Sequence, residues 1–107
     1  MTAPANINAP VVDRYGPTLD ALRPGCGPEE RRLRCGILYL RDRATAALRV
    51  AGWEARCILE HIEALAAVHA FATMPTEELA ELRRGMIRLM QTAMALDMRG
   101  PRAGGLA

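Results

Sequence analysis

The amino-acid sequence predicts an all-α protein, with three amphipathic helices behind an extended, proline-rich N-terminal arm. Hydrophobic residues make up 50% of the 107 residues but aromatic residues only 4%, so alanine, leucine and methionine supply most of the apolar content. That composition favours helices over strands. Apolar residues recur at intervals of three and four between residues 29 and 99, and most prolines precede this stretch. A chain of this length forms one domain with a small core.

Residues 1–28 are predicted to form the extended arm. They contain five prolines and three glycines. Proline removes an amide donor and disfavours helix at the preceding residue. One turn of helix is expected at residues 18–23, with Thr18 as its cap. Three apolar side chains are expected to hold the arm against the helices: Tyr15, Leu19 and Leu22.

The first helix is predicted over residues 29–51. Pro28 followed by Glu29 and Glu30 is typical of a helix start, because acidic side chains complement the N-terminal dipole. Apolar residues then fall on one face and arginines occupy the rest of the circumference. The apolar face consists of Leu33, Ile37, Leu40, Ala44, Ala47, Leu48 and Ala51. Gly52 is expected to mark either a break after this helix or a weak point within one longer helix over residues 29–72.

The second helix is predicted over residues 53–72. Its apolar residues cover more than half of the circumference, leaving a narrow polar strip of Arg56, Glu60 and Glu63. A helix of this kind is expected at the centre of the fold, covered on several sides.

The third helix is predicted over residues 76–99, with Thr76 at its start and acidic residues in its first turn. It carries an apolar seam and, beside it, methionine at every fourth position. The seam is Leu79, Leu82, Met86, Leu89, Ala93 and Leu96, and the methionines are Met86, Met90, Met94 and Met98. Gly100 and Pro101 are expected to stop the helix, which leaves residues 100–107 as a flexible tail and residues 29–99 as the helical domain.

The apolar helix faces exceed what three helices of this length bury among themselves. The sequence therefore predicts a homodimer, or a chain that offers one face to another protein. Methionine side chains suit an adaptable contact surface as well as an ordinary core. The leading functional hypothesis is a non-enzymatic helical protein-binding module, that is, an adaptor, chaperone or inhibitor of a larger protein. Its expected contacts are Leu82, Met86, Met90 and Met94.

The alternative hypothesis is a small dimeric nucleic-acid-binding regulator that uses the first helix. Residues 29–51 contain six arginines against three acidic residues. Binding of this kind would depend on Arg31, Arg34 and Arg41. However, these arginines spread around more than half of the helix, whereas phosphate binding favours a single basic stripe. The net charge of +2 is also too mild to indicate such a partner.

Enzymatic and metal-binding functions have the weakest support in the sequence. Cys57 and His61 share a helix face, and Cys26 and Cys35 could add ligands, but the spacing matches no zinc-binding pattern. Both Cys57 and His61 are expected on a buried face, where a thiolate nucleophile is disfavoured. No glycine-rich phosphate loop is present. We therefore predict no catalytic residues, no metal and no cofactor.

The location expected from the sequence is the cytoplasm. The first ten residues lack the basic segment and apolar run of a secretory signal. No run of about 18 uncharged apolar residues is present, so no membrane partner is expected. Three cysteines in such a chain are expected to be reduced thiols.

Overall fold

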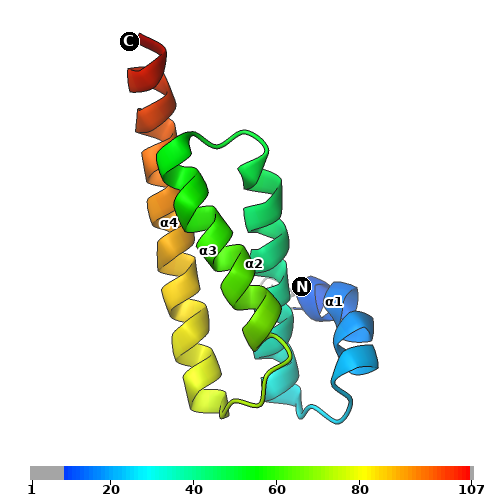
Figure 1. Ribbon diagram of the computed structural model, residues 1–107. Helices are drawn as coiled ribbons and strands as arrows, with labels where there is room; N and C mark the ends of the chain where they lie inside the picture. Colours follow the sequence, from blue (N-terminus) through cyan, green and yellow to red (C-terminus); the bar gives the residue numbers. More distant parts are fainter. Residues whose placement is uncertain (1–8, 107) are drawn as a thin grey trace, which may run out of the picture.

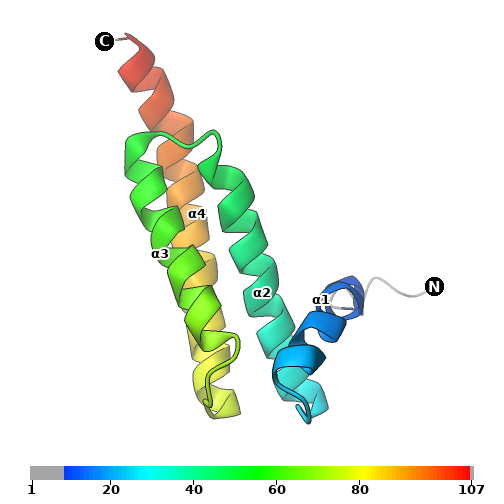
Figure 2. The ribbon, with the colours of Figure 1, turned by 45° about the vertical axis from the view of Figure 1, so that its right-hand side comes forward.

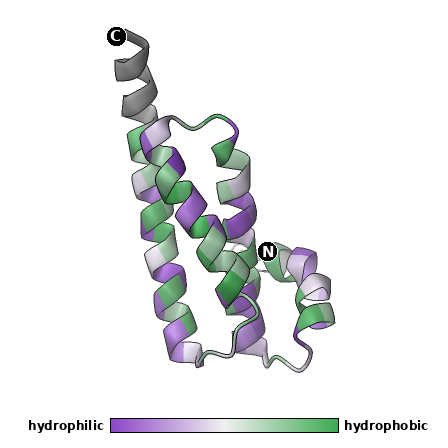
Figure 3. Ribbon diagram, in the orientation of Figure 1, coloured by the Kyte–Doolittle hydropathy of each residue, from purple (hydrophilic) through white to green (hydrophobic). Residues whose placement is uncertain are grey.

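The computed structural model describes residues 9–106, and the side-chain environment of residues 11–96. Four helices make up the described part: α1 (Ala9–Leu22), α2 (Pro28–Leu48), α3 (Trp53–His69) and α4 (Thr76–Leu106). The all-α prediction is confirmed, but the number of helices is four instead of three. Hydrophobic residues recur along α2, α3 and α4, as the spacing of three and four predicts (Figure 3).

Helices α2, α3 and α4 form a bundle in which α2 and α4 run in the same direction and α3 runs opposite to both (Figure 1). Helix α1 lies outside this bundle, beside the N-terminal half of α2, against which it mainly packs (Figure 2). The chain thus places α2 between α1 and the other two helices.

The central helix is α2, and the prediction of a central second helix is wrong. Six consecutive residues of α2, from Leu33 to Leu38, are buried, so the helix is covered on all sides there. Helix α3 buries only the stripe formed by Ala55, Leu59, Ile62 and Ala66. The difference arises because α1 covers the side of α2 that a three-helix arrangement leaves open.

The prediction of an extended arm is wrong over Ala9–Leu22, because this segment is helical. Pro17 lies inside this helix, where its missing N–H leaves the carbonyl of Asp13 without its usual partner. Asp13 is exposed, so water can satisfy that carbonyl. Tyr15 and Leu19, one turn apart, are 5% and 0% exposed and hold α1 on α2 as expected. Leu22 is 64% exposed and does not contribute to that contact. Residues 1–8 lie outside the described residues.

Of the two alternatives that the sequence leaves open at Gly52, the structure shows the break. Helix α2 ends at Leu48, and Gly52 precedes the first residue of α3, so residues 29–72 form two helices. At its other end α2 begins at Pro28, one residue before the predicted start, with both acidic residues in its first turn. In the turn between α1 and α2, Gly25 has a φ of 88°, which glycine adopts without strain.

Helix α4 begins at the predicted Thr76 but does not stop at residue 99. It continues through Gly100 and Pro101 to Leu106, so the predicted tail over residues 100–107 is wrong, although Ala107 lies outside the described residues. The last turns of α4 project beyond the loop between α2 and α3 (Figure 1).

Candidate functional site

Two depressions with mostly apolar linings flank α4. The α3–α4 groove has a volume of about 360 Å³ and is lined by Leu65, Leu82, Gly85, Met86, Arg88, Leu89 and Thr92. The α2–α4 pocket has a volume of about 240 Å³ and is lined by Gly36, Tyr39, Leu40, Arg43, Arg83, Ile87, Met90 and Gln91. These two surfaces form the candidate functional site.

The methionines predicted to form one surface are divided between core and exterior. Met86 and Met90 are 1% and 6% exposed and belong to the core, whereas Met94 is 45% exposed. The reason is helical geometry, because each step of four residues turns the side chain by about 40° around the axis. After two such steps, the side chain at position 94 therefore lies outside the core, while those at positions 86 and 90 lie within it. The side chain of Met98 lies outside the described residues.

Leu82, the fourth predicted contact, lies on the α3 side of α4. It is half-buried and lines the α3–α4 groove together with Leu65 and Leu89. Val68, one turn beyond Leu65 on α3, is 61% exposed. Among the described residues that line this groove, Arg88 is the one with a charge. The predicted contact set thus belongs to two different flanks of α4.

The α2–α4 pocket combines an apolar floor with two guanidinium groups. Leu40 and Met90 are buried beneath it. Arg83 extends from α4 across α2 at Gly36, where an added Cβ would lie 2.6 Å from the Arg83 Nε. On the same pocket, Arg43 donates a hydrogen bond from Nη1 to the Tyr39 hydroxyl at 3.0 Å. Its guanidinium carbon lies 5.8 Å from the centre of the Tyr39 ring. Among the described residues, neither Arg43 nor Arg83 has an acidic partner.

The three arginines of the nucleic-acid hypothesis do not form an open basic stripe. Arg34 is completely buried. Arg31 forms an ion pair with Asp20, and Arg41 forms one with Asp42 at 3.4 Å. Their positive charges are therefore largely neutralised within the fold.

Arg34 has a structural role that the sequence analysis missed. Its Nε donates to Glu30 Oε2 at 2.7 Å. Its Nη1 donates to the backbone carbonyls of His69 at 2.7 Å and Ala70 at 3.2 Å. Its Nη2 donates to the carbonyl of Met74 at 3.4 Å. One side chain thereby satisfies free carbonyls at the C-terminal end of α3 and in the loop that follows. The sequence contains one signal that this side of the helix is buried. Leu38, one turn beyond Arg34, is apolar although it lies outside the predicted apolar face.

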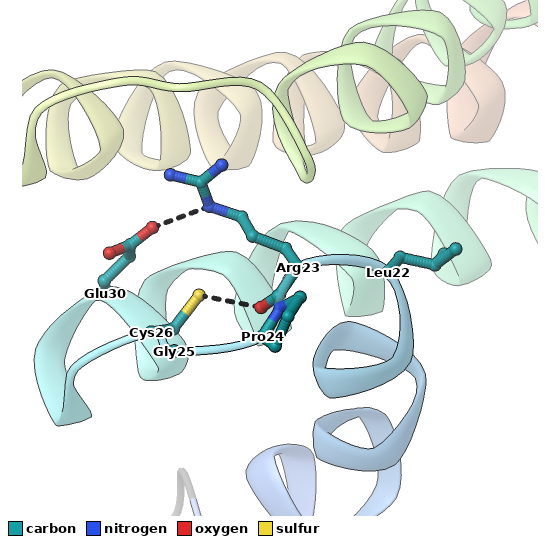
Figure 4. Close-up of a pocket in the computed structure, with 6 residues that line it drawn as sticks. All are labelled: Leu22, Arg23, Pro24, Gly25, Cys26 and Glu30. Carbon is teal, nitrogen blue, oxygen red and sulfur yellow. Dashed lines mark hydrogen bonds and ion pairs between the residues drawn. The ribbon is translucent and has the colours of Figure 1, made fainter.

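The turn between α1 and α2 contains a further depression, lined by Leu22, Arg23, Pro24, Gly25, Cys26 and Glu30. Arg23 and Glu30 reach toward each other and form an ion pair of 2.9 Å, while Leu22 points away from them (Figure 4). Hydrogen bonds from Arg34 and Arg23 lower the pKa of Glu30 below its ordinary value. The charges in this depression therefore compensate one another, and they extend the network of Arg34.

None of the cysteines in the described residues forms a disulfide. Cys26 donates a hydrogen bond to the Arg23 carbonyl at 3.5 Å, and its pKa is raised, mainly by burial and then by Glu30. Cys35 is fully buried, which raises the pKa of its thiol. Cys57 and His61 are both exposed, so their predicted burial is wrong. Raised thiol pKa values disfavour the nucleophilic thiolate at Cys26 and Cys35.

The cysteine–histidine set considered as a metal site does not come together. Within residues 11–96, no three side chains of histidine, cysteine, aspartate or glutamate are grouped so that they could hold a metal ion. The described helices also include none with the length and apolar character needed to cross a membrane. Comparisons with protein-family models, curated proteins and solved structures find no match to this chain.

Proposed function

We propose that this chain is a non-enzymatic helical protein-binding module, an adaptor, chaperone or inhibitor, with α4 as its central contact element. The observation that supports the proposal is the pair of apolar depressions along the two sides of α4. Grooves between helices are a common docking place for an amphipathic helix of a partner.

The exposed apolar side chains beside these depressions add to the proposal. Val68 lies one turn beyond Leu65 of the α3–α4 groove, and Met94 lies one turn beyond Met90 of the α2–α4 pocket. Covering such side chains stabilises a complex by roughly 25 cal/mol per Å² of apolar area removed from water. The unbranched methionine side chain also adapts to partners of different shape.

The partner is a different protein or a second copy of the chain. Light scattering coupled to size-exclusion chromatography separates these two cases, because a homodimer doubles the mass of 11.7 kDa. A concentration-dependent mass would show that the chain is its own partner.

Affinity capture from a lysate of the source cells tests the proposed function. The wild-type chain is compared with Val68→Asp and Met94→Asp, which place a charge on exposed positions of the two flanks. Ala67→Asp is the matched control, since Ala67 is exposed on α3 and lines neither depression. We expect at least one flank variant to lose a protein that the control retains, with or without nuclease treatment. Recovery of nucleic acid alone, or an identical set of proteins from every variant, would contradict the proposal.

A further inference from the structure

We infer that the α2–α4 pocket binds an acidic amphipathic helix of a partner protein, whose carboxylates pair with Arg43 and Arg83. This inference rests on the proposed function and names the flank of α4 and the chemistry of the partner.

The charge of the pocket is uncompensated. Of the eight described residues that line it, two are arginine and none is acidic. Elsewhere in the described chain, eight arginines form ion pairs: Arg14, Arg23, Arg31, Arg32, Arg34, Arg41, Arg56 and Arg84. Arg43 and Arg83 differ from these because they lie beside an apolar floor without an acid. A carboxylate brought to a guanidinium there forms charge-assisted, often bidentate, hydrogen bonds.

The shape of the pocket favours a helix over a small molecule. Its volume of about 240 Å³ lies below the range of roughly 300–1,000 Å³ common for small-molecule sites. The apolar floor also extends beyond the pocket, because Ile87, Met90 and Met94 follow one another at spacings of three and four along α4. The pocket lies between α2 and α4, which run in the same direction (Figure 2). A partner helix along this strip can place apolar side chains on the floor and acidic ones at the rim.

Gly36 positions one of the two charges. Because it has no side chain, Arg83 can lie across α2 with its Nε close to the glycine. Alanine at this position would displace the guanidinium without removing it. Alanine also favours a helix interior over glycine by up to about 1 kcal/mol, so Gly36→Ala is expected to remain folded.

Calorimetric titration with two synthetic peptides tests the inference. The acidic peptide is an 18-residue amphipathic helix with leucines on one face and glutamates beside them, and the neutral peptide has glutamine at each glutamate. We expect the acidic peptide to bind at least about tenfold more tightly than the neutral one. Its affinity should fall when the NaCl concentration is raised from about 50 to 500 mM.

Four variants locate the binding site. Arg43→Gln and Arg83→Gln are each expected to weaken binding of the acidic peptide about tenfold, and Gly36→Ala by several-fold. Arg49→Gln is the matched control, because Arg49 is exposed and forms no ion pair among the described residues. It should leave the affinity unchanged. Circular dichroism of each variant confirms that the helices are retained.

Several results would overturn the inference. Equal binding of both peptides, no binding of either, or an affinity insensitive to both pocket arginines would each do so. Loss of peptide binding in Val68→Asp but not in Arg83→Gln would place the partner in the α3–α4 groove, contradicting this inference while leaving the proposed function intact. Tighter binding of a DNA duplex that depends on Arg43 and Arg83 would show that these side chains recognise phosphate instead.

Discussion

Arg34 of α2 donates a hydrogen bond of 2.7 Å from its buried guanidinium to the backbone carbonyl of His69, at the end of α3. The same side chain pairs with Glu30, one turn earlier in α2. Glu30 in turn pairs with Arg23, just beyond the end of α1. A single chain of charged groups therefore joins α1, α2 and α3 at one end of the bundle, where the backbone groups at the end of α3 need partners.

Replacing Arg34 with leucine should destabilise the fold by about 3 kcal/mol, measured by urea unfolding. The substitution removes one of the two arginine donors to Glu30 and the side-chain donor to the carbonyls of His69, Ala70 and Met74. Such a loss is large beside a total stability of roughly 5–15 kcal/mol for a domain of this size.

The matched control for this substitution is Arg32→Leu. Arg32 is half-exposed, and its ion pair with Glu29 is long, at 4.0 Å. Exposed pairs of this kind contribute at most about 1 kcal/mol. Similar losses in the two variants would contradict the structural role assigned to Arg34.

Tyr15 should ionise only near pH 12. Its hydroxyl donates to Asp42, and burial together with this hydrogen bond raises the pKa of Tyr15 to about 12 from an ordinary value of 10.0. Because the folded pKa is the higher one, the associated stability is fully present below pH 10.0 and is lost as the pH rises toward 12.

Absorbance titration of the Tyr39→Phe variant measures this pKa directly, since Tyr15 is then the single tyrosine. The midpoint should lie near pH 12 in the folded chain. Asp42→Asn should lower it, because the negative charge that opposes ionisation is removed. A midpoint near 10.0 in the folded protein would show that Tyr15 is not held by Asp42.

Leu19→Ala should destabilise the protein by about 2–4 kcal/mol, because the side chain is fully buried between α1 and the bundle. Leu22→Ala should change the stability by less than about 0.5 kcal/mol, since Leu22 is 64% exposed. Thermal and urea unfolding measure the free energy of unfolding of both variants, in which two leucines of the same helix are replaced. Equal losses of stability in the two variants would indicate that α1 does not pack on α2 through Leu19.

Cys57 should be the fastest of the three cysteines to react with a thiol reagent under native conditions. It is exposed on α3, whereas Cys35 is buried and the pKa of Cys26 is raised. With a chromogenic disulfide reagent, the absorbance should rise in one fast phase that comes from a single thiol. This fast phase should be absent in Cys57→Ser. Cys35 should react only when the protein unfolds. A fast phase that survives Cys57→Ser would contradict this order of accessibility.

The candidate site was only partly predictable, and the methionine ladder shows why. The sequence places Met86, Met90 and Met94 along one helix, and that helix is present. Whether each methionine faces the core depends on where the neighbouring helices lie, and a stripe with four-residue spacing drifts around α4. The α2–α4 pocket depends on Arg83 crossing a glycine 47 positions earlier in the chain, a pairing that no local pattern contains.

The sequence by itself determined the all-α class and the beginning of α4 at Thr76, and it marked Gly52 as the place of a break or a weak point. These features follow from propensities and end signals that act within a few residues. Only the tertiary structure decided that residues 9–22 form a helix, that α2 is central, and that Arg34 is buried while Met94 is exposed. The physical reason is that burial offsets local preferences: a helix interrupted by Pro17 is stable because Tyr15 and Leu19 are covered by α2. That cover comes from residues far along the chain, which local periodicity does not reveal.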